Sequence, residues 1–260
     1  MKKSILSLFL LATISMNVAC KGEKENGEAG EVATATAEST TYVVDTKASV
    51  IEWIGSKPAG KHNGTINLKS GEVAVKNDSI QSGKFVIDMN SIVVTDLKAG
   101  DGKEDLEAHL KGTGDKEGED HFFNVGKFPE GMFEVTSITS ENGKATVNGN
   151  LTLKGVTKPV SFPATVAYEG NNMTLTSDSF QINRTQWNVN YASKSIFDDL
   201  KDKFVNDEIE LVVKLKATKQ YKQKPPIGGF FYFNKSFKAL SKDANLNWKF
   251  SSKILRQLTC

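Results

Sequence analysis

The stretch that most constrains the fold is GNLTLKGVTKPVSFPATV, residues 149–166. It predicts two β-strands joined by a tight turn, because Gly155 suits a turn position and Pro159 suits the start of a strand. Alternation with a period of two gives each strand one apolar and one polar face. Apolar faces of this length must lie against further strands. The apolar positions are Val147, Leu151 and Leu153 in the first strand, and Val160, Phe162, Ala164 and Val166 in the second.

The rest of residues 41–218 supplies those strands. Segments with the same alternation recur at hairpin spacing, and turn signals such as Asn77-Asp78 separate them. The pattern predicts about eight strands, and no helices of normal length alternate with them, which argues against a parallel βαβ sheet. Two short helices are expected, at residues 104–111 and 193–203. We therefore predict an all-β, eight-stranded, antiparallel up-and-down barrel with one or two short helices.

The inward face of this barrel is a candidate ligand site. A barrel of about eight strands has an interior that side chains fill or that holds one small ligand. The residue pattern alone favours a filled core over a lining for an apolar chain. The inward candidates are Ile51, Trp53, Ile66, Leu68, Phe85, Ile87, Met89, Phe133, Val135, Phe162, Phe180, Ile182 and Leu211.

Composition excludes several function classes. The formal net charge is +2, but residues 221–260 carry eight Lys or Arg and one Asp, which leaves the body acidic and argues against nucleic-acid binding. The two cysteines, Cys20 and Cys260, lie outside the body, so disulfides do not organise it. Nothing resembles a nucleophile elbow, a P-loop or a dinucleotide fingerprint, so no catalytic residue is predicted.

The N-terminus predicts export. Lys2 and Lys3 precede an apolar run that ends at Val18, which is typical of a signal peptide over residues 1–20. Cys20 follows a small residue and resembles the lipidation site of a bacterial lipoprotein, although Asn17 stands where such signals usually have Leu. An ordinary signal peptide is the alternative. We expect a periplasmic or outer-membrane lipoprotein, with residues 21–40 as a flexible tether.

Residues 219–260 form a basic, aromatic tail that differs from the body. Pro225-Pro226 and Gly228-Gly229 interrupt regular structure near its start, and Lys residues are interleaved with Phe, Tyr and Trp. The tail is either a segment that binds anionic lipid or a non-native extension from a shifted reading frame. We expect it to be poorly ordered.

The body also resembles the YceI-like family of lipocalin-like secreted proteins. The matching pieces are YVVDTKASVIEWIG, GKFVIDMNSIVV, HLKG followed by HFFNVGKFPEGMFEV, GNLTLKGVTKPVSF and SFQINRTQWNVNY, in the family's order. They cover nearly all of residues 41–218. The chain departs from the family in having Ala48-Ser49 where many members have His beside Ser, and in its acidic loop at residues 112–120.

The resemblance implies a hollow barrel that holds a polyisoprenoid lipid, with no reaction. Two other functions stay open: a redox accessory that binds a quinone-like lipid, and a filled-barrel interaction module. No resident cofactor or metal is expected, although His109 and His121 flank the acidic loop. Arg184 is a candidate contact for a ligand head group, with structural closure together with Trp187 as the favoured alternative. The oligomeric state, a dimer included, is left open.

Overall fold

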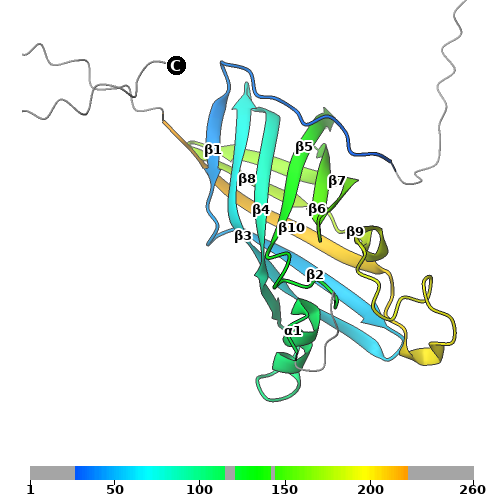
Figure 1. Cartoon of the computed structure of the whole chain (residues 1–260). Coiled ribbons are helices and arrows are strands. Elements are labelled where there is room, and N and C mark those ends of the chain that lie inside the picture. The colour runs from blue at the N-terminus through cyan, green and yellow to red at the C-terminus, as the bar shows by residue number, and fades with distance from the viewer. Residues whose placement is uncertain (1–26, 115–120, 142–143, 222–260) are drawn as a thin grey trace, which may run out of the picture. The chain divides into compact units, whose positions relative to one another are not determined.

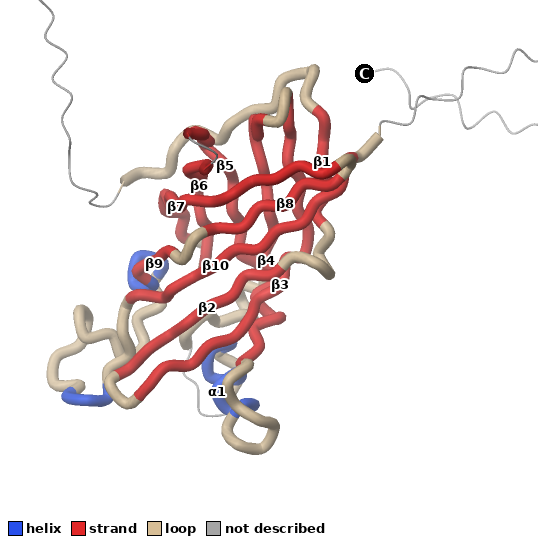
Figure 2. Tube along the Cα trace, turned by 180° about the vertical axis from the view of Figure 1, so that it is seen from behind, coloured by secondary structure: helices blue, strands red, loops and turns tan. Residues whose placement is uncertain are grey.

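The computed structural model describes residues 27–114, 121–141 and 144–221. All strands of this part belong to one antiparallel sheet that closes on itself (Figures 1 and 2). The strands are β1 (Thr40–Val44), β2 (Val50–Lys57), β3 (Gly60–Lys76), β4 (Ser79–Val94), β5 (Glu130–Glu141), β6 (Lys144–Leu153), β7 (Val156–Glu169), β8 (Asn172–Ser177), β9 (Phe180–Asn183) and β10 (Glu208–Lys219).

Strand β10 closes the barrel. It pairs with β2 on one side, where Leu211 faces Trp53, and with β8 on the other, where Leu215 faces Leu175. Strands β1 and β2 share one place beside β10, and so do β8 and β9. The ring therefore has eight positions made from ten strands. The predicted eight-stranded barrel is confirmed, with two of its positions interrupted.

The hairpin turns explain the sharp reversals between strands. Asn77 and Asp78, between β3 and β4, have φ angles of 51° and 55°. Lys154 and Gly155, between β6 and β7, have φ angles of 47° and 74°. Two successive positive φ values are typical of the two-residue turn whose twist matches that of antiparallel strands. The predicted turn at Gly155 is therefore present.

The helices are few. Helix α1 (Lys103–Lys111) lies between β4 and β5, as predicted, and Gly112 ends it with a φ of 69°. The predicted second helix is wrong, because residues 193–203 hold only the 3-10 turn η2 (Lys201–Lys203). Asp199 and Lys201 have positive φ angles, which an α-helix does not accommodate. None of the helices in the described residues is long and apolar enough to span a membrane.

Part of the predicted tether lies against the barrel. The Asn150 side chain accepts a hydrogen bond from the Gly30 amide (2.9 Å) and donates one to the Gly30 carbonyl (2.7 Å). The Ala33 amide donates to the Val135 carbonyl (2.9 Å). Gly30 and Ala33 are therefore held on β6 and β5, while the flexible tether over residues 21–40 stays a prediction.

Several predictions fall outside the described residues. They are the signal peptide with Cys20, the tether before residue 27, and the tail from residue 222. The same holds for Asp115, Glu117, Glu119 and Asp120 of the acidic loop.

Candidate ligand cavity

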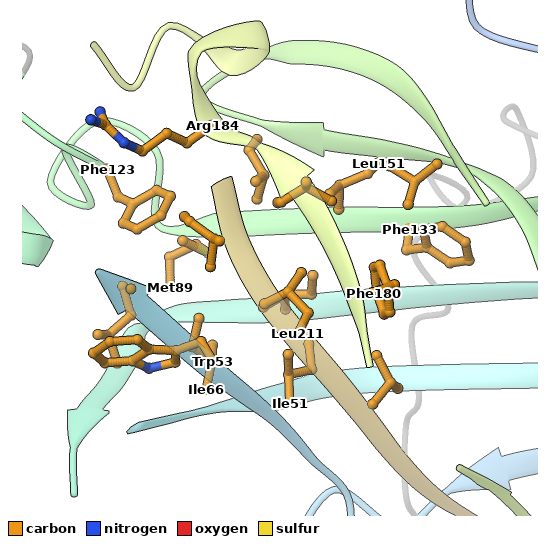
Figure 3. A pocket seen from close by; sticks show the side chains of 18 of the residues that line it. Ile51, Trp53, Ile66, Met89, Phe123, Phe133, Leu151, Phe180, Arg184 and Leu211 are labelled. Atoms are coloured by element: carbon orange, nitrogen blue, oxygen red, sulfur yellow. The ribbon is translucent and has the colours of Figure 1, made fainter. Parts of the chain in front are cut away.

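The barrel is hollow. Its cavity has a volume of about 390 Å³, within the range of roughly 300–1,000 Å³ that is typical of small-molecule sites. Every one of the thirteen inward candidates lines it, and so does Arg184. Ile51 and Trp53 reach it from β2, Ile66 from β3 and Leu211 from β10 (Figure 3). The filled core that the residue pattern alone favoured is therefore not what forms.

Glycines on the inner face make room for aromatic rings. A Cβ atom on Gly149 would lie 2.3 Å from Cζ of Phe133, so the ring lies directly over this residue. A Cβ atom on Gly64 would lie 2.6 Å from Cζ2 of Trp53 and 1.8 Å from the Val93 carbonyl oxygen. Larger residues at either position would displace these rings, so the two glycines set the shape of the wall.

Four phenylalanines form a continuous aromatic strip on the wall. The ring centroids of Phe85 and Phe133 are 6.3 Å apart, those of Phe133 and Phe162 are 5.7 Å apart, and those of Phe162 and Phe180 are 4.5 Å apart. Separations of this size are favourable for ring pairs. The strip gives the cavity a smooth carbon surface on which an apolar chain can lie.

The polar lining gathers at one end. The cavity reaches solvent-exposed residues at Lys57 and Gly60, beside the β2–β3 turn, and at Tyr191 and Lys203. The other lining residues are buried or half-buried. We therefore place the mouth of the cavity between the β2–β3 turn and residues 191–203, near the end that also carries α1 (Figure 1).

Arg184 closes the wall next to this mouth. It is 1% exposed and begins the 3-10 turn η1 (Arg184–Trp187). Its Nε–H donates to the Asn206 carbonyl (3.1 Å), its Nη2 to the Val205 carbonyl (2.9 Å), and its Nη1 to the Val189 carbonyl. These contacts match structural closure, the favoured alternative, rather than a head-group contact.

A largely buried carboxylate accompanies Arg184, and the Ser195 hydroxyl donates to its other oxygen. Asp207 Oδ1 lies 3.5 Å from Nη2 of Arg184. Burial lowers the pKa of the Arg184 guanidinium, and the negative charges of Asp207 and Glu208 act in the opposite direction. An arginine stays protonated under such conditions, so this corner keeps a charged pair inside the protein. Trp187 completes the closure, since its indole N–H donates to the Leu151 carbonyl (2.9 Å).

The two histidines that flank the acidic loop meet near the mouth. Nε2 of His121 lies 3.1 Å from Nδ1 of His109, and their ring centroids are 4.5 Å apart. Tyr191 packs edge-on against both rings, at 4.6 Å and 4.7 Å. Within the described residues, no group of three or more His, Cys, Asp or Glu side chains is arranged to hold a metal ion. The two histidines and Tyr191 form an aromatic cluster.

The sequence reasoning missed part of the lining. Four missed residues were already assigned to an apolar face by their alternation, and Ile209, Val213 and Leu215 share the parity of Leu211 on β10. That signal was sufficient to find these seven residues. The mouth residues follow no alternation, so no local pattern marks them. The four missed residues of the hairpin are Val147, Leu151, Leu153 and Val160.

The barrel domain matches a known protein family. A family model with the description "YceI-like domain" matches residues 42–217. A UPF0312 protein of Pseudomonas paraeruginosa is 36% identical over 97 residues, which are 37% of this chain and 44% of the relative. A UPF0312 protein of Vibrio parahaemolyticus is 29% identical over 140 residues, or 52% of this chain and 68% of the relative. The chain thus spans less than half the length of the first of these relatives.

A solved structure supports the same architecture. The crystal structure of BcnA from Burkholderia cenocepacia superposes with a TM-score of 0.52 and 24% sequence identity. The match covers 67% of this chain and 99% of that protein. This likeness concerns the fold alone.

Proposed function

The chain belongs to the YceI-like family, and on that premise we propose that it is a lipid-binding protein whose barrel holds an isoprenoid or a similar apolar ligand. The observation that carries the proposal is the cavity of about 390 Å³ with its almost entirely apolar wall. An unfilled apolar cavity is costly to keep, because its lining lacks contact partners. A ligand that supplies those contacts offsets this cost.

The wall suits a long, flexible, apolar chain. Each methylene that leaves water contributes about 0.8 kcal/mol, so a chain burying about ten of them gains roughly 8 kcal/mol before the loss of its own freedom. Away from the mouth the lining provides carbon surface, while its polar groups gather near the mouth. We therefore expect the tail of the ligand deep in the barrel and any polar end at the mouth.

The proposed setting is the bacterial envelope. Residues 1–20 have the layout of an export signal, and lipidation at Cys20 would anchor the protein to a membrane. A carrier or store of apolar lipid would then work next to the bilayer that supplies it. The second candidate function, a redox accessory with a quinone-like lipid, uses the same cavity and differs in the ligand.

Native mass spectrometry with lipid extraction tests the proposal directly. The protein purified from its own host is expected to carry an apolar species of defined mass, and a visible chromophore in that species would favour the quinone alternative. A protein that arrives empty and takes up no added isoprenoid overturns the proposal.

A matched pair of variants tests whether the barrel interior is the site. Leu211→Trp is expected to fill the middle of the cavity and to weaken binding of retinol, a fluorescent isoprenoid alcohol, by about tenfold or more. Leu211→Ala enlarges the same place and is expected to retain binding. Thermal unfolding of both variants checks that the barrel remains folded. Equal retinol affinity in both would place the ligand elsewhere.

A further inference from the structure

Large exposed apolar side chains concentrate in one short segment. In the part of the chain that the structure describes, six large apolar residues are exposed, and three of them lie within residues 191–197. Ile196 is 51% exposed, Phe197 is 48% exposed and Tyr191 is 43% exposed. Neighbouring exposed apolar residues on a soluble domain mark an interaction surface more often than isolated ones do.

The barrel holds this segment in place. Ser193 is fully buried and pairs with Val205, whose amide donates to the Ala192 carbonyl (2.9 Å). The amides of Ile196 and Phe197 both donate to the Ser193 carbonyl, at 3.2 Å and 2.9 Å. The two apolar side chains are thus presented by a turn whose base is fixed.

The segment forms one side of the cavity mouth. Tyr191 and Lys203 line the cavity, and so do Lys57 and Gly60 of the β2–β3 turn. Asn206 joins the two sides, because its amide donates to the Ser56 carbonyl (2.9 Å) and its side chain to the Ser56 hydroxyl (2.8 Å). Both views of the ribbon show residues 191–203 beside the tip of β2 and β3 (Figures 1 and 2). We call residues 57–61 and 191–203 the lip.

Charges on the lip complement a phospholipid surface. Lys57, Lys61, Lys194, Lys201 and Lys203 are all exposed, and Asp198, Asp199 and Asp202 leave the lip with a net charge of +2. Lysine side chains lay their carbon stems along apolar surface and place the ammonium group among phosphates. Apolar residues flanked by lysines are therefore suited to the boundary between head groups and acyl chains.

We propose that the lip docks on a lipid bilayer, with Ile196 and Phe197 inserted below the head groups, and that the apolar ligand passes between bilayer and cavity through the mouth. The inference rests on the proposed function for the ligand, while the docking itself is independent of it. An apolar ligand has very low solubility in water, so a mouth held against the bilayer spares it passage through solvent.

The test compares a lip variant with a matched control. The double variant Ile196→Ser, Phe197→Ser removes the apolar tip, and Val43→Ser removes a comparably exposed side chain (43%) from β1. All proteins are full chains that carry Cys20→Ser, so that no lipid anchor forms. Retinol transfer is followed from vesicles made of equal parts phosphatidylcholine and phosphatidylglycerol.

The lip variant is expected to take up retinol from vesicles about tenfold more slowly, since it loses two inserted side chains. Its equilibrium affinity for retinol delivered from solution should match that of the control. An unchanged rate of transfer overturns the proposal. The proposal also fails if the wild type is a dimer, the double variant is a monomer and both transfer retinol at the same rate. Ile196 and Phe197 would then contact a second copy of the chain.

Flotation with vesicles that contain no retinol separates the two proposals. Wild type and the Val43→Ser control are expected to float in larger amounts than the double variant. If this result is obtained while none of the proteins binds retinol, the docking proposal is supported and the ligand proposal fails. Equal flotation of all three proteins overturns the proposal that the lip docks on a bilayer, whatever the cavity binds.

Discussion

The two ends of the barrel are closed by different means. Near the end with the β3–β4 turn, several buried apolar side chains pack on one another without lining the cavity, while Val73 and Ile80 beside them do line it. At the opposite end, hydrogen bonds around Arg184 hold the chain across the barrel, and the mouth lies beside them. The residues that fill the closed end are Tyr42, Val44, Val75, Ala145, Ala164, Met173 and Ala217.

This difference matches the place of the exposed lining residues, which all lie at the end with the β2–β3 turn. Close-packed carbon leaves no room for a ligand, so the filled end is blind. Hydrogen bonds are directional and hold the backbone at fixed distances without filling the space beside it. The polar closure at Arg184 can therefore border an open mouth. We therefore expect substitutions at the two ends to lower the free energy of unfolding for different reasons and by different amounts.

The largest expected effect is at the polar end. Arg184→Met should lower the free energy of unfolding by about 3–5 kcal/mol, because it removes the cation beside Asp207 Oδ1 and leaves three backbone carbonyls without their donor. Chemical denaturation followed by circular dichroism measures this loss. Lys84→Met is the control, since it breaks the exposed Lys84–Glu134 pair (2.9 Å) and should cost about 0–1 kcal/mol. Equal losses of unfolding free energy in the two variants would show that Arg184 stabilises the barrel no more than an exposed ion pair does.

Next in size is the filled end. Met173 is fully buried, and Met173→Ala should cost about 2–4 kcal/mol through lost contacts and a new void. Met132→Ala changes a half-buried residue of the same type on β5 and should cost clearly less. Denaturant unfolding compares the two. If Met173→Ala proves as mild as Met132→Ala, the closed end is not packed as described.

An alkaline titration sharpens the picture of the filled end. Burial, assisted by the Asp78 charge and by Tyr42, raises the pKa of Tyr168 to about 12 from its ordinary value of 10.0. A raised pKa means that the stability this residue contributes is present below pH 10 and is lost as the pH rises through 12. Tyr168→Phe should leave stability at neutral pH within about 0.5 kcal/mol of wild type.

The free energy of unfolding between pH 10 and 12 distinguishes Tyr168→Phe from the wild type. Stability of Tyr168→Phe should fall less steeply than that of wild type as the pH rises from 10 to 12. Phenolate absorbance of the wild type should show one tyrosine that ionises late. Identical alkaline limbs in the two proteins would mean that Tyr168 is not shielded from water.

The smallest effect is expected at Asp96, the partner of the cavity-lining His62, at acid pH. Burial raises the pKa of Asp96, but hydrogen bonds from the Asn63 amide (3.0 Å) and from His62 (2.8 Å) outweigh it, and the net pKa is lowered. The stability that Asp96 contributes is thus present above its unfolded pKa of about 3.9 and is lost as the pH falls through the lower folded value.

Asp96→Asn should lose less than about 1 kcal/mol near neutral pH, because the site is partly exposed. Acid titration of unfolding free energy checks this. The wild type should lose its margin over the variant below about pH 4. A constant margin down to the acid end would show that Asp96 acts through something other than its charge.

The alternation of apolar and polar residues predicted the strands. The pairing of β10 with both β2 and β8 confirmed that they form a closed barrel. Ile51, Trp53 and Leu211 point inward because side chains alternate across a strand, and this property needs no knowledge of the partner strand. The segment from residue 193 to 203 failed the same reasoning. Its apolar residues have helical spacing, yet the pairing of Ser193 with Val205 fixes a turn there instead.

The sequence by itself determined which face of each strand is apolar, where most hairpins turn and that the strands form one barrel. Only the tertiary structure decided that the interior is hollow, because the enclosed volume depends on how the strands pair and tilt around the ring. It also decided where the mouth lies. Lys57, Tyr191 and Lys203 meet there through contacts between distant parts of the chain, and no local periodicity records such contacts.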